Sequence, residues 1–138
     1  MRDKDAVLRT ASELKINGVI TDQAETPVRT QAYVASKLGL PGIGEDKAEL
    51  FTNKYLMRQR CKEIGIDTIK FKLVDNVEDA IDFYNQTGKT MIMKPIDSAG
   101  SRGVVKIENT QTIKDEFGYS KDCLLYTSPS PRDGLLSR

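Results

Sequence analysis

Apolar residues near the N-terminus recur at helical spacing and then give way to a short continuous apolar run. Val7, Ala11 and Leu14 fall on one face of a predicted helix over Ala6–Lys15. The run Gly18–Thr21 (GVIT) is typical of a buried strand, and Asp22–Thr26 then reads as the loop at the carboxyl end of that strand. A strand is therefore expected directly after the first helix.

A second helix is predicted from Pro27, because proline suits the first turn of a helix. Its apolar face consists of Val28, Ala32, Ala35 and Leu38. Glycines and a proline end it, so residues 1–45 read as helix, strand and helix, which predicts part of a parallel α/β layer. That order implies an earlier strand, expected to lie before Met1.

A long helical connector is predicted over residues 46–64. Asp46 and Glu49 have the spacing of a capping box, with an N-cap acid and a glutamate three residues later. The apolar side of this helix comprises Met57, Cys61 and Ile64, and Gly65 ends it.

Residues 65–122 predict a small α+β lobe with at least three strands. The expected strands are Ile69–Val74, Met91–Lys94 and Gly103–Ile107, and the expected helices follow Asn76 and run from Thr110 to about Phe117. Asn76 is an expected N-cap, and Gly88 an expected end of the first of these helices.

The last segment, residues 123–138 (CLLYTSPSPRDGLLSR), differs in composition from the preceding residues and shows no helix or strand period. Composition alone favours a disordered linker. The segment also resembles the translation of a sequencing adapter, and this is the preferred interpretation, which sets it apart from the fold. The native chain is then expected to be interrupted near Asp122.

The amino-acid composition excludes several kinds of partner and catalytic site. The chain has 38% hydrophobic and 30% charged residues and a net charge of +1, which is typical of a soluble, cytoplasmic protein without nucleic-acid or membrane partners. The absence of histidine excludes histidine-based triads, histidine-ligated zinc and imidazole acid–base chemistry. Two cysteines provide no disulfide framework.

The segment Lys94–Gly103 (KPIDSAGSRG) is the strongest local candidate for a site. A buried strand ends in a lysine, and small residues separate it from the next strand. Glycine permits positive φ, so successive amides can point into one concavity and meet phosphate oxygens, while Ser98 and Ser101 add hydroxyl donors. The alternative is an ordinary β-hairpin loop with an incidental lysine, and the pattern alone leaves both readings open.

Three other glycine motifs fit poorly. A P-loop places lysine directly after its last glycine, whereas Val104 follows Gly103. Gly42-Ile43-Gly44 follows a helix rather than a strand, unlike a Rossmann fingerprint. The letters of Gly100–Gly103 suit a KH loop, but this loop joins two predicted strands and not two helices.

Taken together, three segments resemble ATP-grasp enzymes over nearly all of residues 5–118. They are NGVITDQAETPVRTQAYVASKLGLPGIG, FTNKYLMRQRCKEIGID and MIMKPIDSAGSRGV. The resemblance is to the branch that includes carbamoyl phosphate synthetase, biotin carboxylase and related carboxylate–amine ligases. It implies a truncated α/β protein, in which the end of a pre-ATP-grasp, Rossmann-like layer precedes the N-terminal α+β lobe of an ATP-grasp domain.

The resemblance also implies the nucleotide contacts. Lys54 matches the first ATP-contacting lysine, although Asn53 stands where many relatives have aspartate, and Lys94 matches the second. The mobile glycine-rich loop over the β- and γ-phosphates corresponds to Ser98, Ala99, Gly100, Ser101, Arg102 and Gly103, with Val104 beginning the next strand. A solvated helix residue remains the alternative for Lys54, and core packing the alternative for Val104.

Gln23 and Glu25 are the candidate substrate contacts, because ligands collect at the carboxyl ends of strands in open α/β sheets. The alternative is a polar loop that caps the following helix. No catalytic residue and no metal ligand is assigned, since the adenine hinge and the Mg²⁺ ligands of the family are expected downstream.

The expected function is the ATP-binding part of an ATP- and Mg²⁺-dependent ligase that forms an acyl phosphate from a small carboxylate and transfers the acyl group to an amine. A homo-oligomer is compatible with the sequence. A non-catalytic ATP-binding module is the alternative function, and the chain as given is expected to be inactive by itself.

Overall fold

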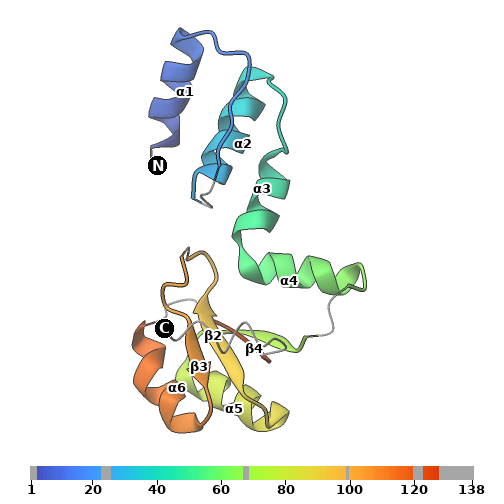
Figure 1. Cartoon of the computed structure of the whole chain (residues 1–138), viewed down its shortest axis with the longest axis vertical. Coiled ribbons are helices and arrows are strands. Elements are labelled where there is room, and N and C mark those ends of the chain that lie inside the picture. The colour runs from blue at the N-terminus through green and yellow to red at the C-terminus, as the bar shows by residue number, and fades with distance from the viewer. Residues whose placement is uncertain (1–2, 23–25, 67–68, 99, 120–122, 128–138) are drawn as a thin grey trace. The chain divides into compact units, whose positions relative to one another are not determined.

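The computed structural model describes residues 3–22, 26–66, 69–98, 100–119 and 123–127, and for Thr26, Tyr119 and 123–127 it describes the backbone alone. The chain divides into two compact units, Met1–Met57 and Arg58–Arg138 (Figure 1).

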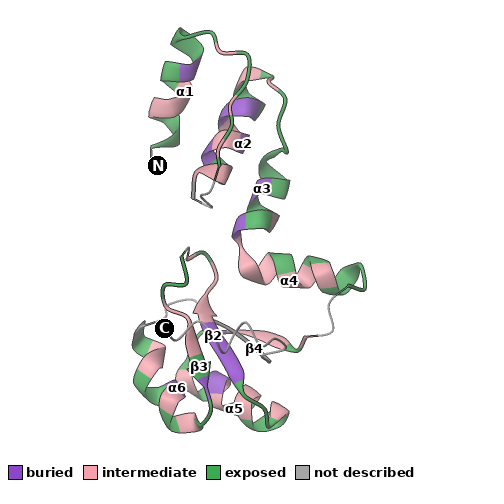
Figure 2. Cartoon of the chain, viewed as in Figure 1, coloured by how far each residue is buried: buried purple, intermediate pink, exposed green. Residues whose placement is uncertain are grey.

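The first unit consists of helices. These are α1 (Lys4–Glu13), α2 (Thr26–Leu38), α3 (Glu45–Thr52) and the first turn of α4 (Lys54–Glu63). Small side chains fill its core, where Ala11, Ala32, Val34, Ala35 and Ala48 are buried (Figure 2). Because these side chains are short, the helix backbones can approach closely. The two helices expected before residue 40 are confirmed.

The strand expected at Gly18–Thr21 is not formed. This segment has no strand structure, and the side chain of Ile20 is 91% exposed. Its Val19 carbonyl instead accepts a hydrogen bond of 2.9 Å from Nε2 of Gln31 on α2. A strand requires a partner strand for its backbone groups, and the described residues of the first unit include none.

The single helix expected over residues 46–64 is also wrong, because the chain breaks at Asn53. Asn53 has extended backbone angles (φ −102°, ψ 109°) between α3 and α4. Asp46 is not an N-cap: Gly44 occupies that position and makes no side-chain capping hydrogen bond. Oδ1 of Asn53 accepts hydrogen bonds from the amides of Tyr55 (3.0 Å) and Leu56 (3.1 Å), so this side chain starts α4.

The second unit contains a four-stranded sheet in the order β1-β4-β2-β3. Its strands are β1 (Phe71–Val74), β2 (Met91–Pro95), β3 (Val105–Ile107) and β4 (Cys123–Thr127), and neighbouring strands are antiparallel. The three strands expected before residue 122 are confirmed. β4 was not predicted, because residues 123–138 show no strand period and were set apart from the fold, yet it pairs with both β1 and β2.

Two helices, α5 (Val77–Thr87) and α6 (Thr110–Glu116), pack on this sheet, and a short 3₁₀ turn (Phe117–Tyr119) follows α6 (Figure 1). Asn76 caps α5 through a 2.7 Å bond from the amide of Asp79, and Gly88 ends it in the left-handed conformation (φ 60°), both as expected. The core formed with the helices comprises Val74, Ala80, Met91, Met93, Ile107 and Ile113. The expected α+β lobe is therefore present.

Candidate functional site

Strand alternation separates the residues of β2 between two faces of the sheet. Met91 and Met93 lie in the core with α5 and α6, so Ile92 and Lys94 belong to the opposite face. The strand register pairs Lys106 of β3 with Ile92. Through β4, which lies between β1 and β2, Phe71 of β1 is in line with Ile92 and Leu73 with Lys94. We call this surface the Lys94 face, defined by Phe71, Leu73, Ile92, Lys94 and Lys106.

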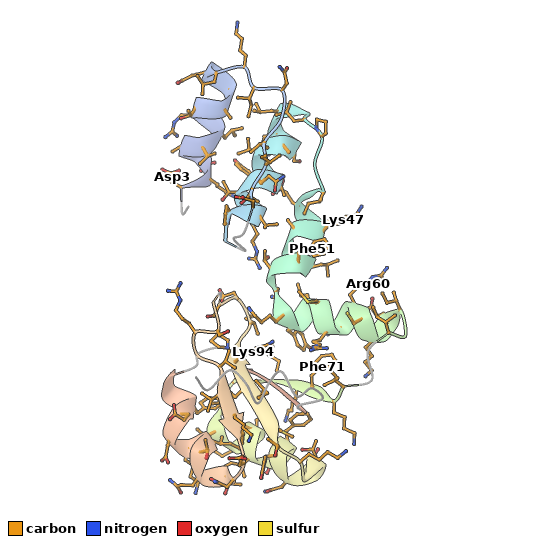
Figure 3. The ribbon with its side chains drawn as sticks, in the orientation of Figure 1. Asp3, Lys47, Phe51, Arg60, Phe71 and Lys94 are labelled. Atoms are coloured by element: carbon orange, nitrogen blue, oxygen red, sulfur yellow. The ribbon has the colours of Figure 1, made fainter. Side chains whose placement is uncertain are left out.

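The Lys94 face is apolar with cations at its edge. Ile92 is 1% exposed, so β2 is buried on both faces up to the point where Lys94 begins to emerge. Lys94 lies where the strand meets the loop (Figure 3). Nζ of Lys106 pairs with Oε1 of Glu108 at 2.7 Å on the surface, so part of its charge is already neutralised. Lys94 is the cation of this face that lies next to the loop between β2 and β3.

The loop between β2 and β3 closes on itself. Ser98 Oγ donates to the carbonyl of Arg102 at 2.8 Å, and the amide of Val104 donates to the carbonyl of Ser101 at 3.3 Å. In this conformation the hydroxyl of Ser98 shapes the loop. Its expected role as a phosphate donor requires the hydroxyl to turn away from Arg102.

Part of this loop has the alternation of φ that is typical of an anion-binding nest. Gly100, Ser101 and Gly103 have positive φ (66°, 58° and 72°) and Arg102 does not, so the sign of φ alternates over Ser101–Gly103. Alternation of this kind can direct successive amides into one concavity. A positive φ at Ser101 costs roughly 1–2 kcal/mol relative to an ordinary conformation. Such local strain is concentrated at ligand-binding segments, so it supports the phosphate reading over an incidental hairpin.

Lys54 lies in the other unit from Lys94. It is the first residue of α4, directly after the cap Asn53, and its side chain is half-buried. Three further predicted site residues, Gln23, Glu25 and Ala99, lie outside the described residues. The structure thus groups Lys94 with Ser98 and Gly100–Val104 in one segment of the second unit.

Metal ligands are absent from this group. Among the residues that the structure describes, no three carboxylate or thiolate side chains come together in a way that could hold a metal ion. Lys94 and the backbone amides of the loop are donors, which suit phosphate oxygens. No helix in the described part of the chain is long and apolar enough to cross a membrane.

Two features of the structure were not predicted from the sequence. Lys106 could have been found, because simple alternation along β3 places it on the face opposite Ile107. A hydrogen bond of 2.6 Å from Nε of Arg29 to Oγ1 of Thr52 had no sequence signal, since it joins helices whose packing is not local. Outside these segments, a shallow groove between α1 and α2 contains none of the predicted site residues.

No family model matches the chain. It is 35% identical over 105 residues to the alanine–anticapsin ligase of Bacillus subtilis (strain 168), a match that covers 76% of this chain and 22% of that protein. The chain thus spans less than a quarter of the length of this curated relative.

Solved structures with the same fold include an L-amino acid ligase from Bacillus licheniformis (TM-score 0.73, 20% identity, 92% of this chain and 31% of that one). The biotin carboxylase domain of 2-oxoglutarate carboxylase from Hydrogenobacter thermophilus, solved with MgADP and bicarbonate, has a TM-score of 0.73 at 16% identity, covering 90% of this chain and 30% of that one. These likenesses confirm the fold class expected from the sequence.

Proposed function

Because this chain belongs to the ATP-grasp superfamily, we propose that it is the ATP-binding part of an ATP-dependent carboxylate–amine ligase. One observation carries the proposal: Lys94 lies near the end of β2, whose first three residues are buried, and the sign of φ alternates over Ser101–Gly103 in the loop that follows. That arrangement sets a cation and converging amides next to an apolar surface, which is what a nucleotide with its phosphates requires.

Each proposed residue has a separate role in holding ATP. Lys94 binds phosphate oxygens as a point charge, and Gly100–Val104 supply backbone amides from a loop that closes over the β- and γ-phosphates. Lys54 contacts ATP from the start of α4, a role that rests on its sequence match. Ala99 belongs to the same loop by sequence, and Gln23 and Glu25 are proposed to contact the substrate.

The proposed reaction has two steps. A carboxylate oxygen attacks the γ-phosphorus of ATP, which gives an acyl phosphate and ADP. An amine nitrogen then attacks the acyl carbon, phosphate leaves, and the nitrogen loses a proton. Mg²⁺, when bound, neutralises the phosphate charge, while the residues of this chain position the nucleotide and exclude water.

Amino acids are the proposed substrate class for both the carboxylate and the amine. The curated relative is an alanine–anticapsin ligase, and a structure of the same fold is an L-amino acid ligase. Small carboxylates and amines need no extended docking surface, in agreement with the proposal that neither nucleic acid nor membrane is a partner.

Replacement of Lys94 by alanine in the full-length parent tests the proposal. Loss of this charge should cost roughly 2–5 kcal/mol of nucleotide or transition-state binding, because the charge faces a largely desolvated phosphate site. The measurement is kcat/KM for ATP in an assay of amino-acid-dependent phosphate release.

Lys114→Ala is the matched control, since Lys114 is an exposed lysine on α6 of the same unit. It should leave kcat/KM unchanged. An unchanged kcat/KM in the Lys94→Ala enzyme would reject the assignment. A parent that binds ATP in a Lys94-dependent way but releases no phosphate would instead be a non-catalytic ATP-binding module.

A further inference from the structure

Arg29 on α2 contacts the end of α3 through its side chain. Its Nε donates a 2.6 Å hydrogen bond to Oγ1 of Thr52, the last residue of α3. Thr52 is buried, whereas Arg29 is an exposed residue. The arginine therefore reaches from the surface of one helix to a fixed hydroxyl at the end of another.

The hydroxyl of Thr52 has a defined orientation. Oγ1 of Thr52 donates to the carbonyl of Ala48 at 2.9 Å, one turn earlier in α3. A hydroxyl has one hydrogen and two lone pairs, so with its hydrogen used in this way the oxygen can accept from Arg29. The contact with Arg29 is consequently directional, and it holds the last turn of α3 from outside the helix.

The chain turns immediately after this contact. Thr52 is followed by Asn53, which has extended angles and caps α4, and then by Lys54, the first residue of α4. The backbone direction at Asn53 sets where Lys54 begins. The hydrogen bond from Arg29 therefore holds Thr52, the residue directly before Asn53. The change of backbone direction at Asn53 in turn orients Lys54.

We propose that Arg29 is a positioning residue for Lys54, acting through Thr52 and the helix break at Asn53. The inference rests on the proposed contact of Lys54 with ATP. Arg29 itself touches neither ATP nor substrate in this proposal. Its loss lets the α3–α4 junction move, and a shift of about 1 Å in a binding group can cost up to about 100-fold in activity.

Four variants of the full-length parent test this inference: Arg29→Met, Thr52→Val, Thr52→Ser and the Arg29→Met/Thr52→Val double variant. Methionine keeps a long apolar stem without the donor, and valine keeps the shape of threonine without the hydroxyl. We expect the KM for ATP to rise roughly tenfold in either single variant, with kcat nearly unchanged, because a ground-state contact is weakened. The double variant should show no further rise, and Thr52→Ser should restore the parental KM.

The matched control is Arg60→Met. Arg60 is an exposed arginine near the other end of α4, and its Nη1 pairs with Glu63 at 3.1 Å. It should leave the KM for ATP unchanged. In a Lys54→Ala background, Arg29→Met should add nothing to the KM, since the residue that it positions is already gone.

Several results would overturn the inference. If Arg29→Met raises the KM while Thr52→Val does not, Arg29 acts on the ligand directly. If the variants lower the melting temperature without changing the KM, the contact is merely structural. Failure of the proposed function is distinguishable, because Lys94→Ala would then also leave kcat/KM for ATP unchanged.

Discussion

The side chain of Asn53 determines where helix α4 begins. In the sequence it was a departure from the aspartate found in many relatives. In the structure its Oδ1 accepts from the amides of Tyr55 and Leu56, which makes it the N-cap of α4. Asparagine and aspartate are nearly equivalent as N-caps, so the departure preserves the break between α3 and α4.

Replacement of Asn53 by alanine should lower stability by about 0.5–2 kcal/mol, because two amides at the start of α4 lose their acceptor. Asn53→Asp should keep the cap and most of the stability. The measurement is urea unfolding of the 138-residue chain followed by circular dichroism. Asn85→Ala, at an exposed position inside α5, is the control and should stay within about 0.5 kcal/mol. Equal stability of Asn53→Ala and the unmodified chain would contradict the capping role.

The structural roles of single residues could be predicted from the sequence to different extents. Asn76 and Gly88 were correctly predicted to begin and end α5, because each stands at a clear change in hydrophobic period. Asn53 was missed, since the apolar pattern continues on both sides of it. The hydroxyl of Ser98 was expected to face a ligand, and its bond to Arg102 could only be seen in the folded loop.

At the scale of elements, β1 and α5 are joined by a small polar network. Nζ of Lys72 donates to Oδ1 of Asp79 at 2.9 Å, and Asn76 donates to the other carboxylate oxygen at 3.1 Å. The hydrogen bond and charge of Lys72 hold the pKa of Asp79 below its usual value of 3.8, with a smaller contribution from Asn76. The pair is partly exposed, so solvent screens it and its effect on stability is modest.

This network predicts a pH dependence of stability. A carboxyl group whose pKa is lowered by folding stabilises the native state above its unfolded pKa, near 3.8, and this contribution is lost as the pH falls through the lower folded pKa. Lys72→Met should therefore reduce the loss of stability on acidification below about pH 4, relative to the unmodified chain. Thermal unfolding between pH 2.5 and 6 measures this.

Lys114→Met provides the comparison for that experiment, since it removes an exposed lysine from α6 in the same unit. Its acid profile should follow that of the unmodified chain. Identical profiles for Lys72→Met and the unmodified chain would show that the pair with Asp79 contributes nothing measurable.

Elements stabilised by their own sequence were predicted well, and those that depend on distant partners were not. The periodic face of α5 and its caps lie within one short segment, and its core position followed. The run Gly18–Thr21 has a strand-like composition but no described partner strand, so it forms no strand and Ile20 is exposed. Conversely, β4 has no regular pattern of its own, yet β1 and β2 supply backbone partners on both sides.

At the scale of the whole chain, the predicted ATP contacts are distributed over both compact units. Lys54 belongs to Met1–Met57, and Lys94 with the glycine-rich loop belongs to Arg58–Arg138. The sequence correctly placed Lys94 near a strand end, whereas Lys54 was predicted inside a single helix over residues 46–64 and instead begins α4. How the two act together was not predictable from either segment, because no periodicity links residues in separate units.

The distribution of these contacts predicts how the isolated chain behaves. It spans 22% of the length of the alanine–anticapsin ligase, and its described residues contain no cluster of three metal-ligating side chains. We therefore expect residues 1–138 alone to show no ATPase or ligase activity and to bind ATP only weakly, with a Kd above roughly 1 mM, equivalent to less than about 4.1 kcal/mol of binding free energy.

Calorimetry with ATP and Mg²⁺ measures this affinity, with Lys94→Ala in the same chain as the control for specificity. Weak binding that the substitution abolishes would mean that the loop and Lys94 recognise phosphate by themselves and that the remaining affinity of the parent comes from contacts outside this chain. Micromolar affinity would contradict the prediction, since the residues of this chain would then suffice to hold the nucleotide. In that case the Lys94 face and its loop would be a complete ATP site, and the rest of the parent would contribute to chemistry and not to binding.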